Sequence, residues 1–224
     1  MYKSIVISAF CAWSHLASAD VCVSHSFLGK ECGKGQVEYV TSIGQTVMNG
    51  TEVTGKASIT GPATLTSVHI NKLSVVGPSQ VVESHVDHMS ITGPVAMKKS
   101  SVDTAHLVGN ADISDSTLTS LSIVGPLDMV SSKAQKVTVV NPLTRITDSE
   151  IGVLVNQSKK HDDQIMGSDY TPVVCISDQS RVSKVEFSHI KGVVFASAKL
   201  AHKPEIINGQ WRQGPCESIK GSDS

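Results

Sequence analysis

The chain has few aromatic residues, no dense charged run and little net charge. Phe, Trp and Tyr make up 4% of the 224 residues, so a core must be filled by aliphatic side chains. The formal net charge is −1, and the basic runs are the short pairs Lys98-Lys99 and Lys159-Lys160. This charge pattern gives no electrostatic basis for binding nucleic acid or an anionic membrane.

The common catalytic and cofactor motifs are also missing. The sequence holds no G-x-S-x-G, no H-E-x-x-H, no phosphate-binding glycine loop and no dinucleotide fingerprint, so neither a cofactor nor a metal is predicted. These absences do not exclude an enzyme that assembles carboxylates from successive repeats, as glycan-cleaving solenoid enzymes do.

The N-terminus has the pattern of a secretory signal peptide. Residues 1–19 contain an early lysine, a short apolar run and a small-x-small site from Ala17 to Ala19, which predicts cleavage before Asp20. A buried N-terminal helix is the alternative. No run reaches the about 20 apolar residues of a membrane-spanning helix, so we expect a mature chain without a transmembrane segment, secreted or periplasmic.

The cysteines agree with export. Removal of the leader leaves Cys22, Cys32, Cys175 and Cys216, and an even number of cysteines in an oxidising compartment predicts disulfides. Three pairings are possible. We favour Cys22 with Cys32 and Cys175 with Cys216, because each bond then ties a segment at one end of the repeat region. A metal site is the competing interpretation, but no C-x-x-C pair supports it.

A repeat of sixteen residues fills the middle of the chain. Glycines recur at this interval, with an asparagine at the last place: Gly61, Gly77, Gly93, Gly109, Gly125 and Asn141. With glycine as position 1, apolar or small residues occupy positions 3, 5, 8, 10, 13 and 15. Residues two apart share one face of a strand. Each repeat is therefore predicted to form three short strands separated by corners.

Stacked repeats of this kind predict an all-β, single-domain parallel β-solenoid, a triangular β-helix of 16-residue rungs with capped ends. Glycine supplies positive φ at a corner, the following proline needs no ladder N–H, and Asn141 tolerates a left-handed conformation. The serines at position 8 are predicted to form an inward ladder in which each hydroxyl donates to its neighbour: Ser84, Ser100, Ser116 and Ser132.

The pattern also divides the chain into regions. We expect a signal peptide (1–19), an N-terminal cap (20–44), the solenoid (45–156), a polar loop (157–172), terminal rungs with a C-terminal cap (173–216) and a flexible tail (217–224). Inward positions near the ends are assigned to Val47, Ala57, Ile59, Leu143, Val153, Val155, Ser180, Val182, Val185 and Phe187. The aromatic residues expected to cover the open sheet edges are Phe27, Tyr39, Phe187, Phe195 and Trp211.

Outward positions supply three sets of candidate functional residues. The outward residues of the third strand form an uncharged stripe that is a candidate association face: Ser74, Val76, Ser90, Thr92, Ser122, Val124, Thr138 and Val140. Two stacked carboxylate pairs are candidates for a cation or a sugar: Asp112 with Asp128, and Asp87 with Asp103. His69 and His85 share position 9, with His88 nearby, and are interpreted as solvated surface residues rather than as a metal or pH-sensing pair.

The rungs that contain "LSVVGP", "MSITGP" and "LSIVGP" resemble the bactofilin type of polymer-forming β-helix over residues 45–156. The resemblance implies a scaffold, although bactofilins are cytoplasmic and this chain has a leader and cysteine-bearing ends. Hexapeptide acyltransferases match less well, because their rungs run in multiples of six. We expect an exported non-enzymatic module that is structural, adhesive or ligand-binding, with self-association or a polysaccharide or cell-surface ligand as its partner. The alternative is a polysaccharide lyase or hydrolase on the same scaffold.

Overall fold

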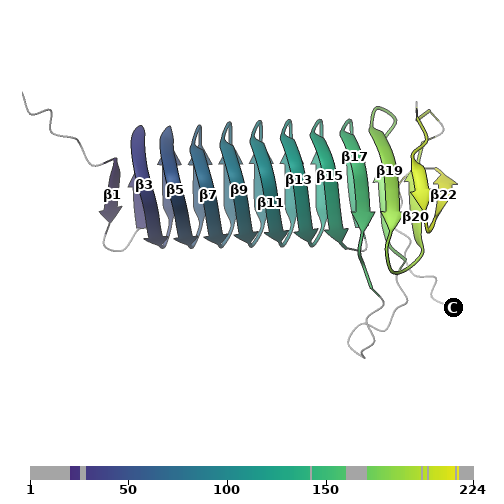
Figure 1. Ribbon diagram of the computed structural model, residues 1–224, viewed down its shortest axis with the longest axis horizontal. Coiled ribbons are helices and arrows are strands. Elements are labelled where there is room, and N and C mark those ends of the chain that lie inside the picture. The colour runs from purple at the N-terminus through teal and green to yellow at the C-terminus, as the bar shows by residue number, and fades with distance from the viewer. Residues whose placement is uncertain are drawn as a thin grey trace, which may run out of the picture.

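The computed structural model confirms the β-solenoid. It describes residues 21–25, 29–141, 143–159, 171–197, 199–200, 202–214 and 216. These residues form about 11 turns of 16-residue rungs, with 71% of the structure in strands and no helix in the described part. Figure 1 shows the coils stacked along one long axis from β1 to β22. The described residues include no helix that would be long and apolar enough to cross a membrane.

Two sheets run the length of the stack. Each strand pairs in parallel with its neighbours, except for the antiparallel pair of β1 and β2. The sheet of short strands contains, in spatial order, β1 (Cys22–His25), β2 (Gly29–Cys32), β4 (Thr46–Asn49), β6 (Ala63–Thr66), β8 (Ser79–Val82), β10 (Val95–Lys98), β12 (Ala111–Ser114), β14 (Leu127–Val130), β16 (Leu143–Thr147), β18 (Val173–Ile176), β20 (Gly192–Ala196) and β22 (Gly209–Gln213). The sheet of longer strands contains β3 (Gly35–Ile43), β5 (Thr51–Thr60), β7 (His69–Val76), β9 (His85–Thr92), β11 (Ser101–Val108), β13 (Thr117–Val124), β15 (Lys133–Val140), β17 (Glu150–Asn156), β19 (Arg181–Phe187) and β21 (Glu205–Ile207).

Each coil has two strands where the sequence predicted three. The second and third predicted strands are joined in one longer strand that changes phase in the middle. In β11, Val102 is buried, Asp103 and Thr104 both face outward, and Ala105 is buried again. The ladder also omits Asp103 while it pairs the residues on either side. The expected corner is therefore present as a bend within a continuous strand.

The core is made of stacked aliphatic columns, as the repeat predicted. At position 5 the buried side chains follow one another from coil to coil: Leu65, Val81, Met97, Ile113 and Met129. Strand pairing aligns them in register, so each side chain packs against its equivalents above and below. This arrangement removes apolar surface from water in every coil, which a single coil cannot do alone.

The predicted glycine corner is confirmed. Glycine is required there for two reasons, its positive φ and the close approach of the neighbouring coil. Gly93 has φ +140°, and a Cβ built there would lie 2.5 Å from the carbonyl oxygen of Gly77. Asn141 does not follow the predicted left-handed conformation, since it is not among the described residues with positive φ. Its Oδ1 instead accepts a hydrogen bond of 2.8 Å from the N–H of Leu143. A side-chain turn therefore replaces glycine at this coil.

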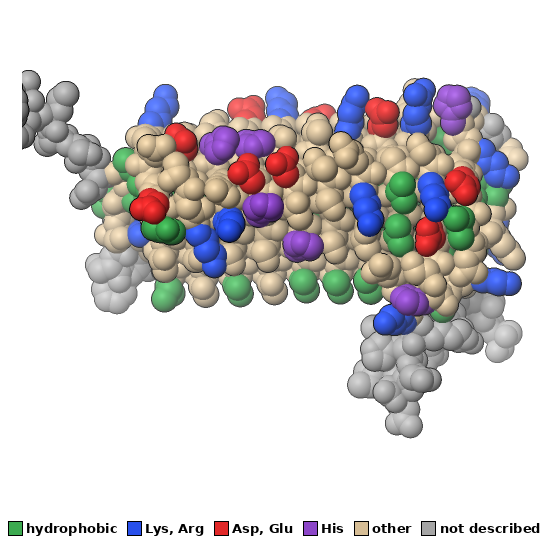
Figure 2. Space-filling model, viewed as in Figure 1, with side chains coloured by type: hydrophobic (Ala, Val, Ile, Leu, Met, Phe, Trp, Pro, Cys, Tyr) green, Lys and Arg blue, Asp and Glu red, His purple; other side chains and the backbone are tan. Residues whose placement is uncertain are grey.

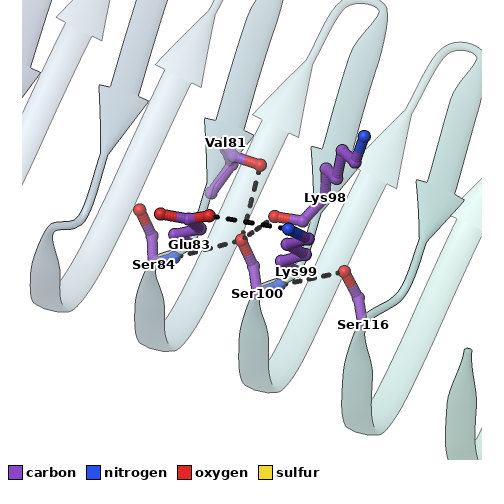
Figure 3. A network of polar contacts seen from close by, with 7 residues as sticks. All are labelled: Val81, Glu83, Ser84, Lys98, Lys99, Ser100 and Ser116. Atoms are coloured by element: carbon purple, nitrogen blue, oxygen red, sulfur yellow. Dashed lines mark hydrogen bonds and ion pairs between the residues drawn. The ribbon is translucent and has the colours of Figure 1, made fainter.

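The predicted corner between positions 5 and 8 has no glycine, and its left-handed conformation was not predicted from the sequence. Position 7 is left-handed, with φ between 48° and 51°, in residues of mixed type: Ser67, Glu83, Lys99, Asp115, Ser131 and Asp148. The serine that follows holds this corner. In Figure 3 the N–H of Ser84 donates to Oγ of Ser100 over 3.2 Å, and that hydroxyl donates to the Lys98 carbonyl over 2.9 Å. The predicted donation from hydroxyl to hydroxyl is therefore wrong, because each hydroxyl accepts from a backbone N–H of the preceding coil.

The register shifts by one residue after Asn141, which corrects several inward assignments. Leu127 pairs with Thr144, seventeen residues on, because the chain gains a residue at this corner. Thr144 is consequently buried, and Leu143 is only half-buried. For the same reason the inward residues of β17 are Leu154 and Asn156, whereas the predicted Val153 and Val155 face outward.

The N-terminal end departs from the predicted register in a similar way. In β4 the inward residues are Thr46 and Met48 rather than Val47, since Met48 pairs with Leu65. The inward positions of Ala57 and Ile59 are confirmed. The parallel ladder already includes β2 and β3, so the solenoid starts before residue 45. At the other end the buried Ser180, Val182, Val185 and Phe187 lie at the predicted inward positions.

The cysteines lie at the two ends, in the pairs favoured from the sequence. Cys22 is bonded to Cys32 across the antiparallel pair of β1 and β2, with a Cα separation of 4.0 Å. Cys175, in β18, is bonded to Cys216 with a Cα separation of 5.5 Å. Each bond therefore ties a segment to one end of the stack.

The aromatic residues fit the predicted end caps only in part. Tyr39 is 67% exposed on β3, and Phe187 belongs to the core. Trp211 is partly buried and packs against the core at the C-terminal end. The predicted leader, Phe27, residues 160–170 of the polar loop and the C-terminal tail lie outside the described residues.

Candidate functional site: the lateral ridge

An exposed row of β-branched side chains follows the edge of the solenoid next to the glycine corner. Each coil contributes the last residue of its long strand, position 16, in register with the next: Ile43, Thr60, Val76, Thr92, Val108, Val124 and Val140. We call this row the lateral ridge. Figure 2 shows hydrophobic side chains projecting in a line from the lower edge of the molecule.

The local sequence explains why the ridge projects. Position 15 faces the core, so position 16 must face outward on the same strand. Glycine follows at once and brings no side chain of its own to cover its neighbour. Exposed fractions are accordingly high: 83% for Ile43, 55% for Val76 and 50% for both Val108 and Val124. The β-branched side chains form a continuous row, with Thr60 and Thr92 among the apolar residues, and exposed apolar surface of this kind marks an association site.

The flanks of the ridge carry little charge. On one side lies the position-14 column, where the predicted residues Ser74, Ser90, Ser122 and Thr138 are in register and half-buried or exposed. His106 takes the remaining place between Ser90 and Ser122. On the other side, a shallow hollow follows the corner prolines Pro62, Pro78 and Pro94, and its lining also includes Asp112. The stripe predicted from the sequence is thus one contiguous face.

The other two edges of the coils differ sharply from this one. The edge at position 7 carries charged residues, with Lys99 Nζ 3.9 Å from Glu83 Oε1. The edge at the bend also carries charge, through residues such as Lys72, Asp87 and Asp103. The lateral ridge is therefore the edge of the repeat region that lacks formal charge between Ile43 and Val140.

The predicted carboxylate pairs lie on open strand surfaces. Asp112 and Asp128 are in register on β12 and β14, and Asp128 also forms an ion pair with Arg145, with 3.5 Å between Nη1 and Oδ1. They border a shallow hollow over the small side chain of Ala96. In this pair one carboxylate is thus neutralised by a neighbouring guanidinium, which the sequence analysis did not recognise.

The two members of the second carboxylate pair, Asp87 and Asp103, have different neighbours. Asp87 Oδ1 lies 3.1 Å from His85 Nε2 on the same strand. Asp103 occupies the equivalent place one coil further on. The sequence placed His69 and His85 in one column but did not connect Asp87 with them. The signal was available, since residues i and i+2 of a strand share a face and His85 is two residues before Asp87.

No family model, curated protein or solved structure matches the chain. The resemblance to bactofilins thus stays a prediction, and the function must be argued from the surface itself.

Proposed function

We propose that this chain is an exported, non-enzymatic structural module whose copies associate side by side through the lateral ridge. The observation that carries the proposal is the uncharged, exposed line of β-branched residues along one edge. Two charged edges accompany it in the same coils, so the lack of charge is particular to this edge. Charged residues are depleted in the same way at the centres of protein interfaces.

The shape and chemistry of the ridge favour a second copy over a sugar or a small molecule. The ridge is convex, whereas small-molecule sites are concave. Its residues are Val, Ile and Thr, without the aromatic side chains that would stack on a flat ligand. A second copy carries the same row at the same spacing of about 4.8 Å, so the two rows match residue for residue along their whole length.

A two-fold arrangement suits this contact best. Self-complementary contacts with a two-fold axis are the commonest in homo-oligomers. An axis across the middle of the ridge pairs Thr92 with Thr92 of the second copy and brings the two rows together in opposite directions. Neither copy brings formal charge to the contact line, so like-charge repulsion does not oppose the approach.

The size of the ridge sets the expected affinity of the dimer. At about 4.8 Å per coil, the row is about 29 Å long. With its flanks, it covers roughly 600 Å² on each copy, which lies at the lower end of specific interfaces. We therefore expect a weak, concentration-dependent dimer rather than an obligate one.

The cysteines support export to an oxidising compartment. The two bonds at the ends of the stack are of a kind that persists in secreted and periplasmic proteins and is rare in the cytosol. They also tie the segments that carry Cys22 and Cys216 to the two ends of the stack. End-to-end polymerisation is then disfavoured, and the lateral edge is left as the surface for association.

Sedimentation velocity over a range of protein concentrations tests the proposal. We expect the native protein to shift from monomer to dimer as its concentration rises. The double variant Val108→Lys with Val124→Lys places four positive charges in a two-fold contact and should remain monomeric. The matched control is Val130→Lys, because Val130 is 40% exposed but lies on β14, away from the ridge.

Two results would contradict self-association through the ridge. One is a native protein that stays monomeric at the highest concentration reached. The other is a double variant that dimerises as the native protein and Val130→Lys do. Far-UV circular dichroism of each variant shows whether the solenoid itself is retained.

A further inference from the structure

Two histidines and an aspartate meet on the outer face of the first regular coils, remote from the lateral ridge. His69 in β7 pairs in register with His85 in β9, and their ring centroids lie 4.7 Å apart. Asp87 follows two residues after His85 on the same strand, with its Oδ1 3.1 Å from His85 Nε2. One ligand atom from each of the three residues lies within 4.8 Å of the other two.

We propose that His69, His85 and Asp87 form a binding site for a divalent transition-metal ion, with Zn²⁺ as its representative. Neighbouring donor atoms around a tetrahedral Zn²⁺ are about 3.3 Å apart. The existing spacing therefore closes by side-chain rotation, without a change in the backbone. Three protein donors leave a fourth position for water or a ligand.

The donor types select the class of metal. Imidazole nitrogen is preferred by Zn²⁺, Cu²⁺ and Ni²⁺, whereas Ca²⁺ and Mg²⁺ are bound through oxygen. Asp87 supplies one negative charge, and Asp103 and Glu52 lie in neighbouring coils of the same face. Figure 2 shows histidine and acidic side chains gathered on this face of the solenoid. The cluster thus combines two imidazole donors with one carboxylate donor, a ligand set that suits these metals.

The strand ladder holds the backbone of the two histidines in fixed positions. The strand ladder fixes the Cα positions of His69 and His85 opposite each other. His85 is 41% exposed and Asp87 is 34% exposed, so an ion reaches the donors directly from solvent. A bound ion would connect β7 to β9 and add a cross-link between successive coils.

Isothermal titration of the full chain, purified without a histidine tag, tests this site. With ZnCl₂ we expect one equivalent to bind, and with CaCl₂ we expect no comparable heat. His85→Gln should weaken Zn²⁺ binding by at least about ten-fold, and so should His69→Gln. His88→Gln is the control, because His88 is an exposed imidazole on the same strand that lies outside the cluster.

Three outcomes would overturn the proposal: no Zn²⁺ bound to the native protein, equal affinity in native protein and His85→Gln, or equal affinity for Ca²⁺ and Zn²⁺. Each variant changes an exposed or half-exposed side chain, so the fold is expected to persist, and circular dichroism verifies it. Co²⁺ provides a second readout, since its visible absorption reports a four-coordinate site with imidazole ligands.

Discussion

Each column serine stabilises a corner that the backbone alone would leave incomplete. The left-handed residue at position 7 interrupts the ladder, and the next N–H has no carbonyl opposite it. Ser100 Oγ accepts that N–H from Ser84, and the N–H of Ser100 in turn donates to Ser116 Oγ over 3.1 Å. Because a buried N–H without a partner is costly, serine at position 8 permits glutamate, lysine and aspartate to precede it in a strained conformation.

Ser100→Ala should lower the free energy of unfolding by about 1–2 kcal/mol. The change leaves the buried N–H of Ser84 without an acceptor, whereas the Lys98 carbonyl still accepts from the N–H of Glu83. Urea unfolding followed by far-UV circular dichroism measures the effect. Ser101→Ala is the control, since Ser101 is the next residue but lies on the outer face, half-exposed. Equal stability of the two variants would show that the serine column is not needed at this corner.

The observed strand pairing agrees with the repeat pattern in some coils and departs from it in others. The inward columns from Gly61 to Asn141 follow from the sequence, because alternation and period both repeat over several coils. The one-residue shift after Asn141 does not, since Val153 and Val155 are as apolar as Leu154. Both registers satisfy the pattern, and strand pairing distinguishes them, since Leu127 lies opposite Thr144 and Val137 lies opposite Leu154.

The left-handed conformation at position 7 and the contact of Asp87 with the two histidines were missed for different physical reasons. Position 7 shares a conformation but not a residue type, so no column of glycine or asparagine marks it. The cluster joins residues from two coils and two positions, His69 with His85 and Asp87. Column-by-column analysis separates them, and side-chain placement is required to bring them together.

Leu154→Ala tests the shifted register of β17. Leu154 is fully buried, so its truncation should cost about 2–5 kcal/mol of the free energy of unfolding through lost burial and a cavity. Val153→Ala should cost less than about 1 kcal/mol, because Val153 faces outward. Urea unfolding of both variants measures the difference. A larger loss of stability for Val153→Ala than for Leu154→Ala would contradict the shifted register.

The complete solenoid presents three edges with different chemistry on one regular frame. Two edges carry charge, and the edge beside the glycine corner carries the lateral ridge. The antiparallel β1 lies at one end, and the two disulfides join segments near both ends to the stack, so we propose the ridge as the surface for another copy. The period that builds the core also spaces the ridge, and every copy of the chain therefore carries a matching row.

Cysteine cross-linking tests the two-fold contact most directly. Thr92 lies at the middle of the ridge, with three ridge residues on either side. The two-fold contact predicts that Thr92→Cys forms a disulfide-linked dimer under mild oxidation, seen by non-reducing electrophoresis, while Val130→Cys on β14 stays monomeric. A Thr92→Cys protein that remains monomeric, or a Val130→Cys protein that links equally fast, would contradict the account.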